Sequence, residues 1–251
     1  GGSGSDTGTF SITGATVISG DVTVDTDVTT GSGTNEDGTL AFSSTIVGAG
    51  GTDNLTINSG SGAITLSGTI GVSAPWDALS INASGGAAAL SIPQIGTGTA
   101  VGNAGTNGAV AIGNSASQSV TLSAAGYKFG GGTTTITSGG HVITAANAKI
   151  FTDGNITLDP ANASQLKTTG AFAITATTAD DTINIAGDIL GVDDTSNETI
   201  TLQAGATNGT SGGTITIGGN IGTQIESVSL KAGTAINLGG NITTVNVSNN
   251  D

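Results

Sequence analysis

Pairs of apolar residues separated by one residue recur along the chain, and four segments repeat the same arrangement of such pairs. The four copies are residues 54–71, 170–191, 197–222 and 226–243. Each copy begins with one apolar pair and, after a turn of variable length, continues with a second pair. Alternation with a period of two is typical of a short β-strand that buries one side. Each copy therefore predicts two strands joined by a turn.

A glycine stands two residues after each second pair, and an isoleucine follows two residues later. These glycines are Gly68, Gly187, Gly219 and Gly240, and the residue after each of them is Thr, Asp or Asn. The first residue of the pair and the last isoleucine keep one spacing in all four copies, as between Ile64 and Ile70. Glycine followed by Asn or Asp favours a left-handed or strained backbone. We expect the four glycines to be structural corners, each followed by a third short strand.

Strand, corner, strand and loop together describe one coil of a β-solenoid, which buries its apolar side only when coils stack. Equivalent residues such as Phe172 and Ile200 are separated by roughly one coil length, as are Leu55 and Leu79. Less regular copies occupy residues 77–96, 118–139 and 154–166, the last with Pro160 in place of the corner glycine. The pattern predicts an all-β rod of about nine or ten coils, ~45 Å long.

The whole chain, 1–251, is predicted to form one elongated domain. We expect a flexible lead-in at 1–9, irregular first coils at 10–50 and regular coils at 51–251. A β-sandwich is the alternative for many short strands with glycine-rich turns. Sandwich hairpins favour Asn-Gly or Asp-Gly turns, and none of those dipeptides lies at the fixed corner in this chain.

The phrases LTINSGSGAITLSGTIG at 55–71 and LSINAS at 79–84 resemble repeats of very large bacterial surface proteins of the filamentous-haemagglutinin and adhesin type. The resemblance extends over about residues 50–250. It implies a single-stranded right-handed parallel β-helix and an extracellular location at a microbial cell surface. It rests on repeat style, so it carries no functional residue over to this chain.

Composition narrows the possible partners. The chain has 251 residues, 44 of them Gly, with 9% charged residues and a net charge of −14. Four Lys and no Arg cannot form the basic clusters that bind nucleic acid or anionic membranes. The sequence contains no apolar run near the length of a membrane-spanning helix, so we expect no membrane insertion. The absence of Cys is compatible with an extracellular protein held together by a long core.

Acidic loop residues are the candidate ligands for a metal. Residues 48–56 partly match a calcium-binding nonapeptide repeat, with Asp53 at its carboxylate position. Two acidic pairs, Asp180/Asp181 and Asp193/Asp194, add carboxylates of the kind that Ca²⁺ prefers. Calcium coils occur in tandem, whereas these matches are isolated and imperfect. Solvated loop carboxylates are therefore the simpler interpretation, and Ca²⁺ is the only cofactor for which the sequence offers ligands.

The amino-acid composition argues against an enzyme. Catalytic β-helices need basic residues or paired carboxylates with aromatic platforms, and this chain has one His, His141, and no Arg. We therefore expect no catalytic residues. The predicted role is a rigid extracellular shaft, filament or coat subunit that assembles end to end with further copies or neighbouring repeats. The alternative is an adhesin module that binds surface glycans or a receptor through variable loops, for example at Trp76 or residues 126–132.

Overall fold

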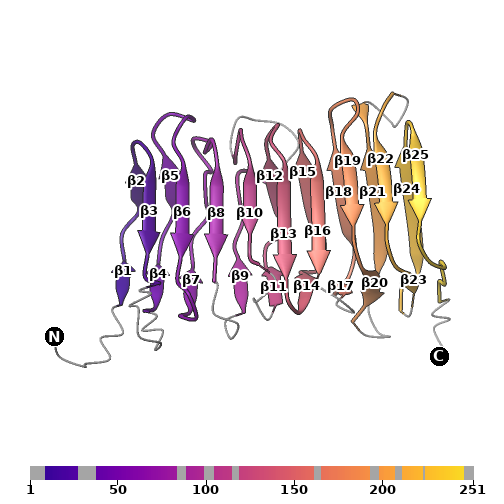
Figure 1. Cartoon of the computed structure of the whole chain (residues 1–251), viewed down its shortest axis with the longest axis horizontal. Coiled ribbons are helices and arrows are strands. Elements are labelled where there is room, and N and C mark those ends of the chain that lie inside the picture. Colours follow the sequence, from indigo (N-terminus) through magenta and orange to yellow (C-terminus); the bar gives the residue numbers. More distant parts are fainter. Residues whose placement is uncertain are drawn as a thin grey trace.

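The structure is a computed structural model that describes residues 9–27, 38–83, 89–98, 105–114, 119–160, 165–192, 198–206, 211–222 and 224–245. The chain winds into a β-solenoid of parallel stacked coils, as the sequence predicts. Figure 1 shows the coils following one another along the longest axis, with β1 at one end and β25 at the other. Each coil passes through three faces of the rod in a constant order.

The first face, along the lower edge of Figure 1, consists of a three-stranded and a six-stranded sheet that meet where β7 packs beside β9. Its strands are β1 (Phe10–Ile12), β4 (Leu40–Phe42), β7 (Ile64–Leu66), β9 (Leu90–Ile92), β11 (Ser119–Leu122), β14 (His141–Thr144), β17 (Gln165–Thr168), β20 (Asp188–Gly191) and β23 (Ile221–Gly222).

The second face contains a two-stranded and a five-stranded sheet. Its strands are β2 (Thr16–Ile18), β5 (Ile46–Gly48), β12 (Gly126–Phe129), β15 (Ala148–Thr152), β18 (Phe172–Ala176), β21 (Thr199–Ala204) and β24 (Ser227–Ala232). Between β5 and β12 two coils contribute isolated bridges. Ile70 and Ile95 continue the parallel ladder from Ile46 to Tyr127, and Trp76 pairs with Thr106.

The third face is one nine-stranded sheet. Its strands are β3 (Val22–Asp25), β6 (Leu55–Asn58), β8 (Leu79–Asn82), β10 (Val110–Ile112), β13 (Thr134–Ser138), β16 (Ile156–Pro160), β19 (Thr182–Ile185), β22 (Thr214–Ile217) and β25 (Ala235–Leu238). Because two coils lack a strand on the second face, the described residues form about seven complete turns, slightly fewer than predicted.

The apolar pairs fill the interior in vertical columns, because neighbouring coils pair in register. Leu55 lies beside Leu79, and Phe172 lies beside Ile200, as the coil spacing predicts. Residues that point inward in the middle of the rod are almost completely buried, whereas the residues between them are partly exposed. Burial of one side of every strand gives the continuous core that the repeated pattern requires.

The four sequence copies are not equivalent in space, which corrects the prediction of one repeated unit. In three copies the second apolar pair lies on the third face, where Ile183, Ile215 and Ile236 form one column. In the copy at 54–71 the corresponding pair, which begins at Ile64, lies on the first face. The same phrase therefore forms a corner between the first and second faces in one coil and between the third and first faces in the others.

The corner glycines are required by close packing between coils. A Cβ on Gly68 would lie 2.2 Å from the carbonyl carbon of Ser44, and one on Gly219 would lie 2.2 Å from Oδ1 of Asp188. On Gly240 it would lie 2.6 Å from Oδ1 of Asn220. None of these three glycines, nor Gly187, has a φ angle in the left-handed region. The predicted left-handed backbone is therefore wrong at these corners, and contact with the coil below explains glycine at Gly68, Gly219 and Gly240.

Candidate functional site

Asp53, the first calcium candidate, is a hydrogen-bonded link between coils. Its side chain is buried, its Oδ1 accepts the N–H of Gly20 at 2.9 Å, and its Oδ2 accepts the N–H of Ala49 at 3.1 Å. Both carboxylate oxygens thus satisfy backbone donors in the loops beside β2 and β5. This arrangement accounts for a buried carboxylate without a bound ion.

Asp180 and Asp181 lie far along the rod from Asp53, in the turn between β18 and β19. Asp181 Oδ2 accepts the N–H of Thr178 at 2.9 Å. Burial raises the pKa of Asp181, and the negative charges of Asp153 and Asp180 raise it further, while hydrogen bonds from Thr178 act in the opposite direction. Among the described residues no group of three or more His, Asp or Glu could hold a metal ion. Asp193 and Asp194 lie outside the described residues, and their role as calcium ligands stays a prediction.

Polar ladders along two corners are a feature that the sequence analysis did not identify. Asp188 Oδ1 accepts the N–H of Asn220 at 2.6 Å, and Asn220 Oδ1 accepts the N–H of Asn241 at 2.9 Å. The same geometry recurs at the start of β3 and β6. Asp21 Oδ1 accepts the N–H of Asn54 at 3.0 Å, and Asn54 Oδ1 accepts the N–H of Ala78 at 3.0 Å. In each ladder the side-chain oxygen of one coil accepts a backbone N–H of the following coil. In the sequence, the Asp or Asn that follows three of the corner glycines is the signal that could have indicated the Asp188–Asn220–Asn241 ladder.

Lys128 is the most unusual charged residue of the second face. Only 4% of its side chain is exposed, although it lies on β12 between two inward-pointing aromatic residues. Its Nζ pairs with Asp153 Oδ2, in the coil that follows, and Thr177 donates a hydrogen bond to the other oxygen of that carboxylate. A buried charge is tolerated when it is paired in this way. This cluster therefore fastens neighbouring coils.

The aromatic residues that the alternative function needs are in the core. Trp76 is fully buried, and so are Tyr127 and Phe129 within residues 126–132. Tyr127 Oη accepts the N–H of Ala124 at 2.8 Å and donates to the carbonyl of Ile92 at 2.9 Å. Burial raises the pKa of Tyr127. None of these three rings lies on the surface, and glycan or receptor binding by the loops around them stays a prediction.

Trp76 lies inside the stack, in a coil that has no strand on the second face. In that coil Ile70 bridges Ile46 and Ile95, Trp76 forms a parallel bridge with Thr106, and the indole occupies the interior beside two glycines. A Cβ on Gly48 would lie 3.5 Å from the ring, and one on Gly71 would lie 3.1 Å from it. The sequence predicts a loop position for Trp76, but its burial depends on neighbouring coils that local sequence does not specify.

His141, the single histidine, begins β14 on the outer side of the first face and is partly exposed. Its Nδ1 accepts the N–H of Gln165 at 3.4 Å, across the β14–β17 pair. Burial lowers the pKa of His141, and the positive charge of Lys167 lowers it further. The neutral ring is therefore a hydrogen-bond acceptor between two strands.

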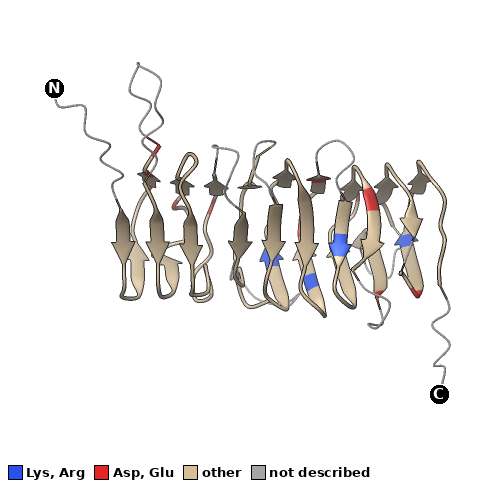
Figure 2. Ribbon diagram, turned by 90° about the horizontal axis from the view of Figure 1, so that it is seen from below, with Lys and Arg blue, Asp and Glu red and all other residues tan. Residues whose placement is uncertain are grey.

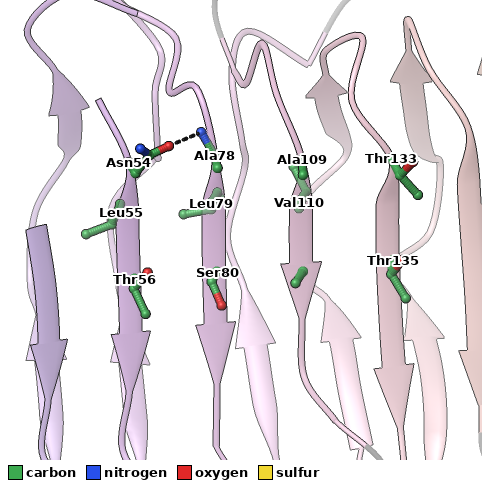
Figure 3. Close-up of a pocket in the computed structure, with 11 residues that line it drawn as sticks. Asn54, Leu55, Thr56, Ala78, Leu79, Ser80, Ala109, Val110, Thr133 and Thr135 are labelled. Atoms are coloured by element: carbon green, nitrogen blue, oxygen red, sulfur yellow. Dashed lines mark hydrogen bonds between the residues drawn. The ribbon is translucent and has the colours of Figure 1, made fainter. Parts of the chain in front are cut away.

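A shallow groove of about 340 Å³ crosses β6, β8, β10 and β13 on the third face. Figure 3 shows its lining and the hydrogen bond that Ala78 N–H donates to Asn54 Oδ1. The groove is lined by Asn54, Leu55, Thr56, Ala78, Leu79, Ser80, Ala109, Val110, Ala111, Thr133 and Thr135. Several of the lining side chains are small, among them Ala78, Ser80 and Ala109. The lining contains no titratable side chain and offers neither an acid nor a base.

Charged residues occupy few positions along the ribbon, as the blue and red segments of Figure 2 show. The four lysines belong to β12, β15, β17 and β24, all in the second half of the chain. The described part of the chain contains no helix that is long and apolar enough to span a lipid bilayer.

Within the described part of the chain, the first and last coils bury their inward apolar residues less completely than the coils between them. We define the C-terminal end surface as β24, β25 and Ile242, and the N-terminal end surface as β1, β2 and β3. Ile236, Leu238 and Ile242 are 42%, 44% and 43% exposed, whereas Ile215 and Ile217 in the preceding coil are fully buried. The described residues thus expose large apolar side chains mainly where the coil stack ends.

No family model, curated protein or solved structure matches this chain. The structure shows the β-solenoid architecture that the resemblance to adhesins implies. The comparisons add no support for that family.

Proposed function

We propose that this chain is a structural, non-enzymatic protein of the microbial cell surface, a rigid shaft or a subunit of a filament or coat. The observation that carries the proposal is the uninterrupted parallel ladder along the third face, where nine strands pair in sequence. Every coil is held to its neighbours by backbone hydrogen bonds and by inward Ile, Leu and Val columns. Such a stack resists bending and presents few segments for proteolysis.

The polar links support the same role. Asp53, Asn220 and the Lys128–Asp153 pair each join one coil to the next rather than converging on a shared cavity. Their side chains are used in holding the stack together. The outer surface consists largely of hydroxyl, amide and methyl groups, which suit a spacer exposed to solvent.

Shape and location test this function together. Small-angle scattering and negative-stain electron microscopy of the purified chain should give straight rods, with a β-stack roughly 40 Å long for nine strands at about 4.8 Å spacing. Antibodies against the chain should label intact cells of the organism that makes it. Compact or flexible particles, or labelling only after lysis, would contradict the proposal. As a control for shape, Ile150→Asp, which buries a charge in the core, should abolish the rod.

A further inference from the structure

We infer that the partner of the end surfaces is a second copy of this chain, added head to tail so that the solenoid continues across the joint. The inference rests on the proposed structural role and names the partner of the rod. The C-terminal end surface exposes Ile236, Leu238 and Ile242 by 42–44%. The N-terminal end surface presents Phe10, Ile12, Val22 and Val24, which are only partly buried although they point into the core. Both surfaces therefore expose the cross-section of the same apolar columns.

The internal register defines the joint on the third face. Column by column, Val22 corresponds to Leu55, and the series continues through Ile183 and Ile215 to Ile236. One more coil step places Val22 of the next copy beside Ile236 and its Val24 beside Leu238. Both ends carry apolar residues at alternate positions, so the step preserves the inward alternation of the sheet.

The second face gives a compatible register. Its ladder connects Thr16 through Ile46, Ile70, Ile95 and Tyr127 to Leu230. The same coil step places Thr16 of the next copy beside Leu230 and Ile18 beside Ala232. A large residue meets a small one at each position, and such pairs fill a layer without overlap.

The polar ladders give the joint its direction. Each Asp or Asn oxygen accepts a backbone N–H from the following coil, and Asn241 is the last and exposed rung of the Asp188–Asn220 ladder. In a head-to-tail joint its oxygen faces the first described coil of the next copy, which begins with β1. Asp21 of that copy lies over Ala235, since these positions share a column, and a small residue leaves room for the carboxylate.

Head-to-tail addition also keeps all strand pairs parallel, as they are within the rod. A tail-to-tail contact between two C-terminal end surfaces would instead pair β25 with β25 in antiparallel orientation, and it would stop at two copies. Open strand edges are strong templates for addition of another strand. The structure thus favours growth in one direction over closed dimers.

Single cysteines test this joint, because the chain has none. Thr23 on β3 and Asn237 on β25 are outward-pointing residues of one column. Across a head-to-tail joint their Cα atoms would be about 4.8 Å apart, within the range of a disulfide. Thr23→Cys and Asn237→Cys variants, mixed and mildly oxidised, should form the mixed disulfide at least about tenfold faster than either homodimer, the ratio expected for ~1.4 kcal/mol of preference.

Thr121→Cys, on an outward position in the middle of the rod, is the matched control and should not couple to Asn237→Cys. A second variant, Leu238→Lys, changes a side chain that is 44% exposed and should leave the rod folded. It should abolish the increase of scattering mass with concentration that we expect of the unmodified chain. Thr216→Lys, at an outward position on β22, should not.

The outcomes separate the joint from the rod itself. Preferred coupling of Asn237→Cys with itself would establish a tail-to-tail dimer and overturn the inference. Straight rods that stay monomeric at high concentration and form no mixed disulfide would also overturn it, while leaving the proposed shaft intact. Particles that are not rods would instead refute the proposed function.

Discussion

Single residues at the corners are restricted by the coil beneath them. Gly132, which precedes β13, illustrates the restriction, because a Cβ there would lie 2.3 Å from the carbonyl carbon of Gly108 and 2.4 Å from the backbone nitrogen of Ala109. The neighbouring Gly131 has room, with its nearest atoms 3.7 Å and 3.9 Å away. Two adjacent glycines thus have different structural roles, which sequence alone does not distinguish.

We therefore expect Gly132→Ala to lower the free energy of unfolding by about 1–3 kcal/mol, since backbone atoms must move apart. Gly131→Ala should change it by less than about 0.5 kcal/mol, as is usual for surface substitutions. Urea denaturation followed by circular dichroism measures both variants. Equal effects of the two substitutions would mean that close approach between coils does not explain the glycine.

At the scale of elements, strand pairs depend on outward side chains as well as on the core. The β14–β17 pair carries the hydrogen bond from Gln165 N–H to His141 Nδ1, and Lys167 lies on the same outer side of β17. Protonation of His141 would replace an acceptor with a donor that faces the Gln165 N–H and the Lys167 charge. Burial, together with the positive charge of Lys167, keeps the pKa of His141 below its usual range.

The lowered pKa predicts the pH dependence of this strand pair. Because the folded protein prefers neutral His141, the stabilisation from the histidine is fully present above its unfolded pKa of about 6.5 and is lost as pH falls through the lower folded value. His141→Asn keeps an acceptor and removes the titration. As the pH falls from 7.5 to 5, the urea midpoint of the unmodified chain should decrease relative to that of His141→Asn. Parallel curves for the two proteins over this interval would contradict the assignment.

The whole molecule is a one-dimensional stack in which each coil contacts mainly its two neighbours. Such architectures tolerate the loss of one complete repeat, because the flanking repeats present the same surfaces. Ile183 and Ile215 are column neighbours on β19 and β22, so residues 183–214 constitute one full coil step. Their removal joins two segments that already have the same face and inward alternation.

Deletion of residues 183–214 should consequently leave a folded rod that is shorter by about 4.8 Å, one inter-strand spacing. Deletion of residues 183–199 is the matched control. It brings Ile200, from the second face, into the position of a third-face residue and should prevent the following coils from stacking. Scattering profiles and far-ultraviolet circular dichroism distinguish the two results, and a folded control variant would argue against coil register as the determinant of the fold.

Much of this organisation could be predicted, because strand alternation and tight turns are local properties. The inward pairs, the coil spacing from Phe172 to Ile200 and the parallel β-solenoid follow from residues close together in sequence. The Asp and Asn of the polar ladders were visible in the corner motif, but their partners lie one coil away. Their function as acceptors became recognisable only when Asn220 and Asn241 were brought into one column.

By itself, then, the sequence determined that this chain forms short strands with one apolar side, that the strands bend at glycine corners and that the coils must stack to bury that side. Only the tertiary structure decided which face each strand joins, as the different positions of Ile64 and Ile183 show. The same holds for the burial of Trp76 and Lys128 and for the exposure of Ile236 and Leu238 in the last described strand. The physical reason is that alternation depends on neighbouring residues, whereas face, burial and exposure depend on the accumulated length of all preceding loops and on the space left by coils far away in the sequence.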